Sequence, residues 1–139
     1  MRVLHLTRDF PPRSTGGLST AVGGLVVASQ HAGISTLTLS FDNWRPKGKG
    51  SLVAQPLSSE RGEGGEVIRV SHPNHLPEAL ERIRVAGCDL VHVHDGMLWS
   101  FAEELKGALR LPLVFMVHVH HARLNALRGL SERTASLEG

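Results

Sequence analysis

The alternation of short apolar runs with helical patterns restricts the fold of this chain more than any other feature. The run from Val3 to Leu6 is nearly continuous, as expected of a strand that is covered on both faces. Strand-like runs occupy residues 2–7, 35–41, 66–70, 89–95 and 111–118, and helical spacing of apolar residues occurs at 18–29, 76–86 and 97–109. This order predicts an α/β fold, a Rossmann-like doubly wound parallel sheet of about five strands.

Adjacent glycines mark the first connection between a strand and a helix. Residues 9–22 read D-F-P-P-R-S-T-G-G-L-S-T-A-V, so a helical pattern begins directly after Gly16 and Gly17. Such glycines allow positive φ angles and a close approach of the backbone to a ligand. The first amides of a helix lack intrahelical acceptors and lie at the positive end of its dipole, where an anion such as diphosphate can bind. A tight connection without a ligand explains the pair equally well, because neither common phosphate-binding pattern is present.

A second glycine pair, Gly23-Gly24, lies inside the predicted helix, where each glycine costs about 1 kcal/mol relative to alanine. We expect close packing of the helix on the sheet to compensate. Residues 42–65 are polar and rich in Gly and Pro, which predicts a long loop with a short hairpin near Leu52 to Gln55. In this loop, Trp44 and the basic stretch 45–49 could contact an anionic or sugar-like substrate, although a solvated loop is the simpler interpretation.

Composition excludes several classes of partner. The 139-residue chain has a formal net charge of +2 with dispersed basic residues, and only 4% of its residues are aromatic, which argues against nucleic-acid binding. The single cysteine, Cys88, excludes an internal disulfide framework and fits a reducing compartment. No signal peptide or membrane-spanning apolar run is recognisable, so we expect a cytoplasmic protein, with peripheral membrane contact left open.

Polar clusters follow three of the predicted strands. They are Arg8-Asp9 with the glycine turn, His94-Asp95, and residues 118–121. Because ligands of parallel sheets bind at the carboxyl ends of the strands, these clusters are expected to converge on one rim.

The nine histidines of the chain raise a metal-site alternative. His92 and His94 share one face of a predicted strand, as do His118 and His120, and this spacing can supply metal ligands for a hydrolase. However, H-V-H-D lacks the further Asp-His of metallo-β-lactamase-type sites, and the chain is too short for an amidohydrolase barrel. Hydrogen-bonded buried side chains explain His5 and His92 more simply.

Three segments together resemble the N-terminal domain of GT-B glycosyltransferases, in particular retaining family 4, which is related to glycogen and starch synthases. The segments are L-T-R-D-F-P-P-R-S-T-G-G-L-S, D-L-V-H-V-H-D-G and P-L-V-F-M-V-H, in matching order and spacing over residues 1–121. The resemblance implies an acceptor-side Rossmann-like domain over 1–121, followed by a helical or frayed tail over 122–139. The C-terminal donor domain of that family is absent from this sequence.

The resemblance also implies roles for individual residues. Gly16 and Gly17 would present backbone N–H groups to the donor diphosphate, and His94, with Asp95, would lie at the rim near the reacting centre or acceptor. Gly16, Gly17 and His94 are the candidate donor-binding residues. His118 would approach the transferred sugar and Asp95 would lie near the reacting centre, so these two are the candidate catalytic residues. The implied substrates are a UDP-, ADP- or GDP-sugar donor and a carbohydrate or small-molecule acceptor, with no metal or other cofactor.

The sequence departs from the family pattern in two places. Ser14-Thr15 stands where synthases carry a lysine before the glycines, and Gly96 stands where relatives often have tryptophan. The first departure argues against a glycogen synthase proper. Because the second domain of the family is missing, we expect the acceptor-side half of a retaining, nucleotide-sugar-dependent glycosyltransferase that needs a C-terminal domain or subunit and is inactive alone. A non-catalytic carbohydrate- or nucleotide-binding module and a metal-dependent hydrolase are the alternatives.

Overall fold

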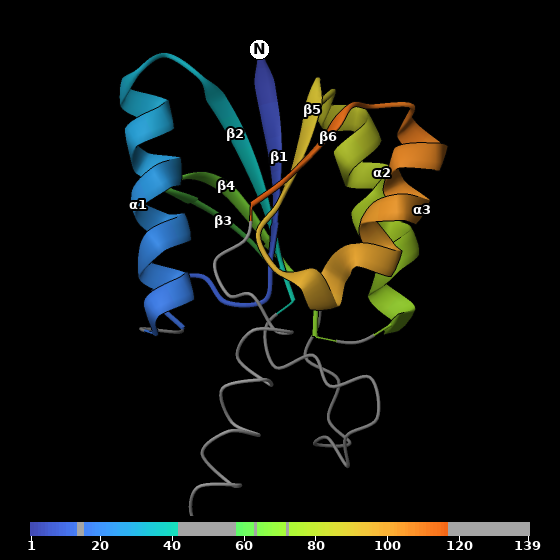
Figure 1. Ribbon diagram of the computed structural model, residues 1–139, viewed down its shortest axis with the longest axis horizontal. Helices are drawn as coiled ribbons and strands as arrows, with labels where there is room; N and C mark the ends of the chain where they lie inside the picture. Colours follow the sequence, from blue (N-terminus) through green and yellow to red (C-terminus); the bar gives the residue numbers. More distant parts are fainter. Residues whose placement is uncertain (14–15, 42–57, 63, 72, 117–139) are drawn as a thin grey trace, which may run out of the picture.

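The computed structural model describes residues 1–13, 16–41, 58–62, 64–71 and 73–116. They form three layers, with α1 on one face of a sheet and α2 and α3 on the other (Figure 1). In the described part of the chain, no helix is both long and apolar enough to cross a membrane. The elements in order are β1 (Arg2–Thr7), α1 (Gly17–His31), β2 (Ser35–Ser40), β3 (Ser58–Gly62), β4 (Gly65–Arg69), the 3₁₀ turn η1 (Pro73–His75), α2 (Leu76–Ala86), β5 (Leu90–Val93), the 3₁₀ turn η2 (Gly96–Leu98), α3 (Trp99–Leu109) and β6 (Leu113–Phe115).

The sheet confirms the predicted Rossmann-like α/β fold. Its strand order is β3-β4-β2-β1-β5-β6, and every pairing is parallel except that of β3 with β4. The first strand is central, as its apolar run predicts, because Leu4 pairs with Leu37 of β2 on one side and with Val91 of β5 on the other.

The two faces of the sheet differ in chemistry. The face under α2 and α3 is apolar, and its side chains form the main hydrophobic core with residues of both helices. The members from the sheet are Leu4, Leu6, Leu37, Leu39, Ile68, Val70, Val91 and Val93, and those from the helices are Ala79, Ile83, Ala102 and Leu105. Because successive side chains of a strand point to opposite faces, the alternate residues of the same strands face α1.

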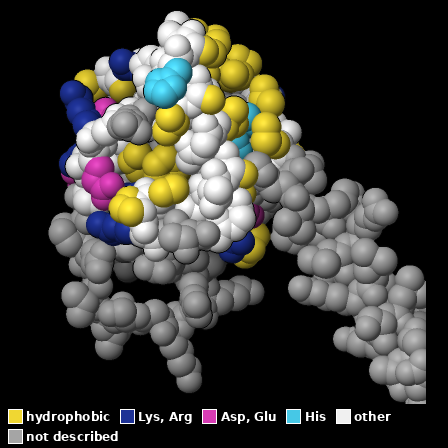
Figure 2. Space-filling model, turned by 90° about the vertical axis from the view of Figure 1, so that its left-hand side faces the viewer, with side chains coloured by type: hydrophobic (Ala, Val, Ile, Leu, Met, Phe, Trp, Pro, Cys, Tyr) yellow, Lys and Arg dark blue, Asp and Glu magenta, His cyan; other side chains and the backbone are white. Residues whose placement is uncertain are grey.

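The face under α1 is mostly polar. Its buried residues include His5, Thr7, Thr36, Thr38, Ser40, Arg69 and His94. The helix packs on it through Val22 and Val26, which contact Phe10 and Val67, and Gln30 Nε2 donates a hydrogen bond of 2.6 Å to Thr36 Oγ1. No Asp, Glu, Lys or Arg occurs in α1. Figure 2 shows the outer surface of the molecule on the α1 side, with hydrophobic and uncharged side chains across its centre and charged side chains at its margins.

The structure corrects the predicted loop at 42–65, because residues 58–62 form the edge strand β3. This strand pairs antiparallel with β4, and Gly65, with a φ of +72°, follows the short connection between them. The segment S-S-E-R-G has no apolar alternation, so its pairing with β4 and the ion pair of Glu60 with Arg69 specify it instead. The predicted hairpin near residues 52–55, Trp44, the basic stretch 45–49, and the tail 122–139 lie outside the described residues.

Candidate functional site at the carboxyl rim of the sheet

Two loops meet at the carboxyl end of the central strands. The chain leaves β1 toward the start of α1 and leaves β5 toward η2 and α3, and both exits lie at the same end of the sheet (Figure 1). Beyond the last residue of β5, the backbone N–H of His94 still donates to Leu6 O at 2.9 Å. Because this hydrogen bond keeps the chain after β5 next to β1, Asp95 lies beside the loop that begins at Arg8.

The glycine turn lies on this rim, as predicted, but its backbone differs from the expectation. Gly16 is the N-cap of α1 with φ −67° and ψ 175°, and neither Gly16 nor Gly17 adopts a positive φ. Apart from its own chain neighbours and helix backbone, a Cβ atom added to either residue would meet no atom of the described residues within 4 Å, and both residues are exposed. Neither the backbone conformation nor packing against the described residues requires glycine at these positions.

The start of α1 also lacks negative charge. Gly16 supplies no capping side chain, and the first turn contains no Asp or Glu. The first N–H groups of a helix have no intrahelical acceptors, and the helix dipole adds partial positive charge there. An anion can therefore approach the exposed backbone of this turn without meeting a side chain at Gly16 or Gly17.

Arg69, which the sequence analysis missed, holds the loop before the glycine turn. Its side chain is 2% exposed and donates from Nη1 to Phe10 O at 3.2 Å and from Nη2 to Pro11 O at 2.6 Å. Its Nε donates to Glu60 Oε1 at 3.0 Å, so the charge is paired. The signal in the sequence was one charged residue within the apolar run V-I-R-V.

Pro11 is fixed from the other side by α1. A Cβ atom on Gly23 would lie 2.9 Å from Pro11 Cγ, so the glycine admits the proline ring against the helix. The expected compensation for Gly23 thus comes from helix-on-loop packing rather than from helix-on-sheet packing. Gly24 has no such contact, since outside its own helix no atom of the described residues lies within 4 Å of its added Cβ.

Asp95 connects the two rim loops. Its Oδ2 accepts a hydrogen bond of 2.5 Å from Arg8 Nε, and its Oδ1 accepts one of 2.8 Å from Met97 N, which caps η2. The Asp95 side chain is buried, whereas that of Arg8 is 35% exposed and brings a positive charge to the rim. Both carboxylate oxygens are engaged, and the catalytic role of Asp95 stays a prediction.

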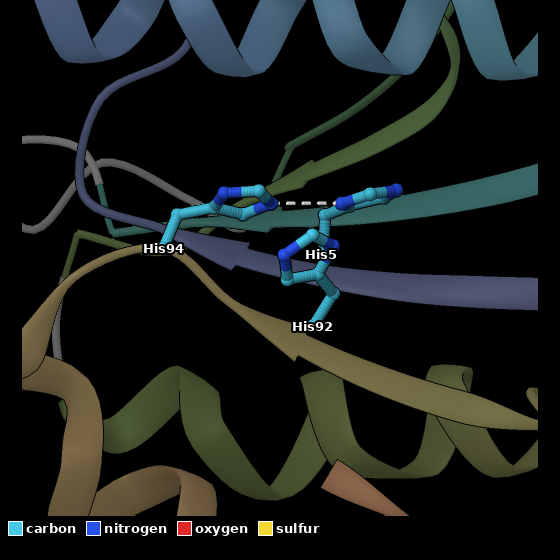
Figure 3. A group of neighbouring side chains, drawn as sticks. All are labelled: His5, His92 and His94. Carbon is cyan, nitrogen blue, oxygen red and sulfur yellow. Dashed lines mark hydrogen bonds between the residues drawn. The ribbon is translucent and has the colours of Figure 1, made fainter. Parts of the chain in front are cut away.

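His94 lies beneath α1 rather than on the surface. It is 1% exposed, and its Nε2 lies 2.9 Å from His5 Nδ1 (Figure 3). The two ring centroids are 5.2 Å apart with 20° between the planes, so the rings lie nearly end to end. The expected contact of His94 with a donor stays a prediction, and His118 falls outside the described residues.

His5, His92 and His94 form one cluster, so the interpretation of His5 and His92 as separate buried side chains is incomplete. The ring centroid of His92 lies 4.1 Å from that of His94 and 5.3 Å from that of His5. Burial, and secondarily the charge of a protonated His92, lowers the pKa of His5 to about 4. His5 is therefore a neutral imidazole at neutral pH, with one N–H group and one lone pair.

Comparison with known proteins gives a distant similarity. No family model matches the chain. An uncharacterized glycosyltransferase of Methanocaldococcus jannaschii is 28% identical over 134 residues, which cover 85% of this chain and 31% of that protein. The chain thus spans less than a third of the length of this relative. It is accordingly a distant, partial relative of a glycosyltransferase.

Proposed function

We propose that the chain is the acceptor-side half of a retaining, nucleotide-sugar-dependent glycosyltransferase of the GT-B type. It would transfer a hexose from a nucleotide sugar to a glycan or small-molecule acceptor once a C-terminal domain, in the same chain or in a partner, completes the site. The similarity to a glycosyltransferase of which the match covers only 31% supports this division. On this proposal the chain alone is inactive.

The observation that carries the proposal is the uncapped start of α1 at the carboxyl rim. Gly16 and Gly17 leave open space around backbone N–H groups, and no side chain of the described residues caps them. A nucleoside diphosphate gains negative charge as the glycosidic bond breaks. Fixed N–H donors aimed at that charge bind the transition state more tightly than the ground state, which accelerates the transfer.

The other rim residues would support this chemistry. Arg8, held by Asp95, adds positive charge to the same rim, so the helix start and a basic side chain would take the part that a metal ion plays in other transferases. We infer that Asp95 positions Arg8 near the reacting centre and that His118 approaches the transferred sugar. In same-face transfer the leaving phosphate helps to take the acceptor proton, so no protein base is assigned.

The test uses the chain together with a C-terminal donor domain, which is either fused to it or added as a separate protein. We expect Gly16→Val and Gly17→Val to lower kcat/KM about 100-fold, the effect of losing one oxyanion donor elsewhere, because the new side chain keeps the diphosphate from the amides. Gly24→Val is the matched control, since its surroundings are equally empty. Thermal unfolding should show that all three variants remain folded.

If the variants at Gly16 and Gly17 transfer sugar as fast as the unsubstituted enzyme, these glycines do not bind the donor. Calorimetry of the 139-residue chain with nucleoside diphosphates, sugar nucleotides and glycans addresses the binding-module alternative. Binding without any transfer by the completed protein would favour that alternative. Hydrolysis that begins only when zinc or manganese is added would favour the hydrolase.

A further inference from the structure

We propose that His5, His92 and His94 bind a zinc ion that links β1 to β5 at the centre of the sheet. The site lies on the face under α1 (Figure 3). It is a structural site, distinct from the glycine turn, and it does not rest on the glycosyltransferase assignment.

The backbone brings the three imidazoles together. His5 pairs with His92 across the parallel strands β1 and β5, and His94 follows two residues later on the same face. Each histidine can offer one ring nitrogen such that the three atoms lie within 4.8 Å of one another. The strand register therefore fixes the origins of all three side chains before any ion binds.

The spacing of one pair is already close to that of zinc ligands. His5 Nδ1 and His94 Nε2 are 2.9 Å apart. Two nitrogens bound to a tetrahedral zinc ion at 2.0–2.1 Å lie about 3.3 Å from each other. A shift of a few tenths of an ångström would let the ion take the place of the proton that this pair shares, while rotation of His92 supplies the third nitrogen.

One ring nitrogen of His5 lacks a hydrogen-bond partner among the described residues. His5 is 2% exposed, and its Nε2 makes no hydrogen bond within the described part of the protein. Buried polar atoms without a partner are uncommon in native structures. When Nδ1 of neutral His5 donates to His94, Nε2 carries a lone pair that a cation can accept, so either nitrogen of His5 can serve as ligand.

The donor set determines which ion fits. The group contains three imidazole nitrogens and no carboxylate, which suits Zn²⁺ and disfavours Mg²⁺ and Ca²⁺, since these prefer oxygen. His92 is only partly buried, so the ion can enter from its side and keep a water molecule as fourth ligand. Because the unfolded chain does not hold the three nitrogens together, zinc binding stabilises the folded state.

The experiment uses the full chain, stripped with EDTA and held at one neutral pH. Zinc is titrated against a chromophoric chelator, cobalt(II) spectra report the coordination number, and thermal unfolding is recorded with and without zinc. We expect one zinc ion per chain, a four-coordinate cobalt spectrum and a higher Tm with zinc. His92→Gln should weaken zinc binding more than about tenfold, the loss seen even for outer-shell partners, and should abolish the rise in Tm.

Controls separate this site from the other histidines. His31→Gln, at the exposed end of α1, should leave zinc affinity unchanged. The triple substitution of His118, His120 and His121 by Gln should do the same. Unchanged zinc affinity in His92→Gln and His5→Gln, a six-coordinate cobalt spectrum, or loss of the ion in the triple variant would each overturn the proposal. If buried His5→Gln fails to fold, the partly exposed His92→Gln decides alone.

Discussion

Arg8 and Asp95 join the loops after β1 and β5 across 87 positions of sequence, with Arg8 Nε 2.5 Å from Asp95 Oδ2. The same carboxylate caps η2 through Met97 N. One side chain thus fixes two loops of the rim relative to each other, and its two oxygens perform separate tasks that substitutions can separate.

We expect Asp95→Ala to destabilise the fold by about 1–2 kcal/mol, because it removes the cap and the partner of Arg8. Asp95→Asn retains an oxygen for Met97 N and should cost less. Urea denaturation of both variants measures the difference, and a double-mutant cycle with Arg8→Ala isolates the ion pair. Equal losses for Ala and Asn would show that the cap contributes nothing.

The glycine pair of α1 gives a prediction with an internal control. Gly23→Ala should destabilise the protein by about 1–3 kcal/mol, because its Cβ would collide with the ring of Pro11. Gly24→Ala meets no neighbour and should stabilise by about 0.5–1 kcal/mol through the higher helix propensity of alanine. Chemical denaturation of the two variants measures both signs, and the same sign in both would contradict the packing of Pro11 on the helix.

Removal of Arg69 should loosen the loop before the glycine turn. Arg69→Met leaves the carbonyls of Phe10 and Pro11 without these donors, and we expect a loss of about 2–3 kcal/mol. The half-exposed Glu60 can be hydrated, which keeps the loss below that of a fully buried ion pair. The control is Arg82→Met, whose surface pair with Glu78 is worth less than about 0.5 kcal/mol. If the two variants lose equal free energy of unfolding, the contacts of Arg69 with Phe10 and Pro11 do not stabilise the loop.

Cys88 tests the packing at the end of α2 through its reactivity. Burial raises the pKa of its thiol from 9.0 to about 11. Since the thiolate is the reactive form, alkylation at pH 8 should be about 100-fold slower in the folded chain than in the unfolded chain. The rate for the folded chain should keep rising with pH up to about 11. A plateau near pH 9, measured by mass spectrometry, would mean that the thiol is solvated.

Much of the fold could be predicted because its signals are local. The apolar run of β1 and the helical spacing after Gly17 depend on residues that are neighbours in sequence, and both elements form where they are expected. Strand β3 was missed because its polar residues acquire a strand conformation only through pairing with β4 and through the contact of Glu60 with Arg69.

The candidate site was less predictable because its contacts are distant in sequence. The ring of His5 meets that of His94 across 89 positions, and Arg69 reaches Phe10 across 59. No spacing rule reports such pairs. For the glycine turn, the position on the rim was predictable from the sequence, but the extended backbone of Gly16 was not.

The chemical difference between the two faces of the sheet has a consequence for motion. Helix α1 covers a face of hydroxyl and imidazole groups, and only a small apolar cluster packs between the helix and the sheet. Helices α2 and α3 cover the face that holds most of the buried aliphatic side chains. Moving α1 away from the sheet therefore exposes little apolar surface. It costs less free energy than moving α2 and α3 away from the other face. The layer that begins at the glycine turn is therefore the one that opens more readily, and the layer of α2 and α3 is the one that resists opening.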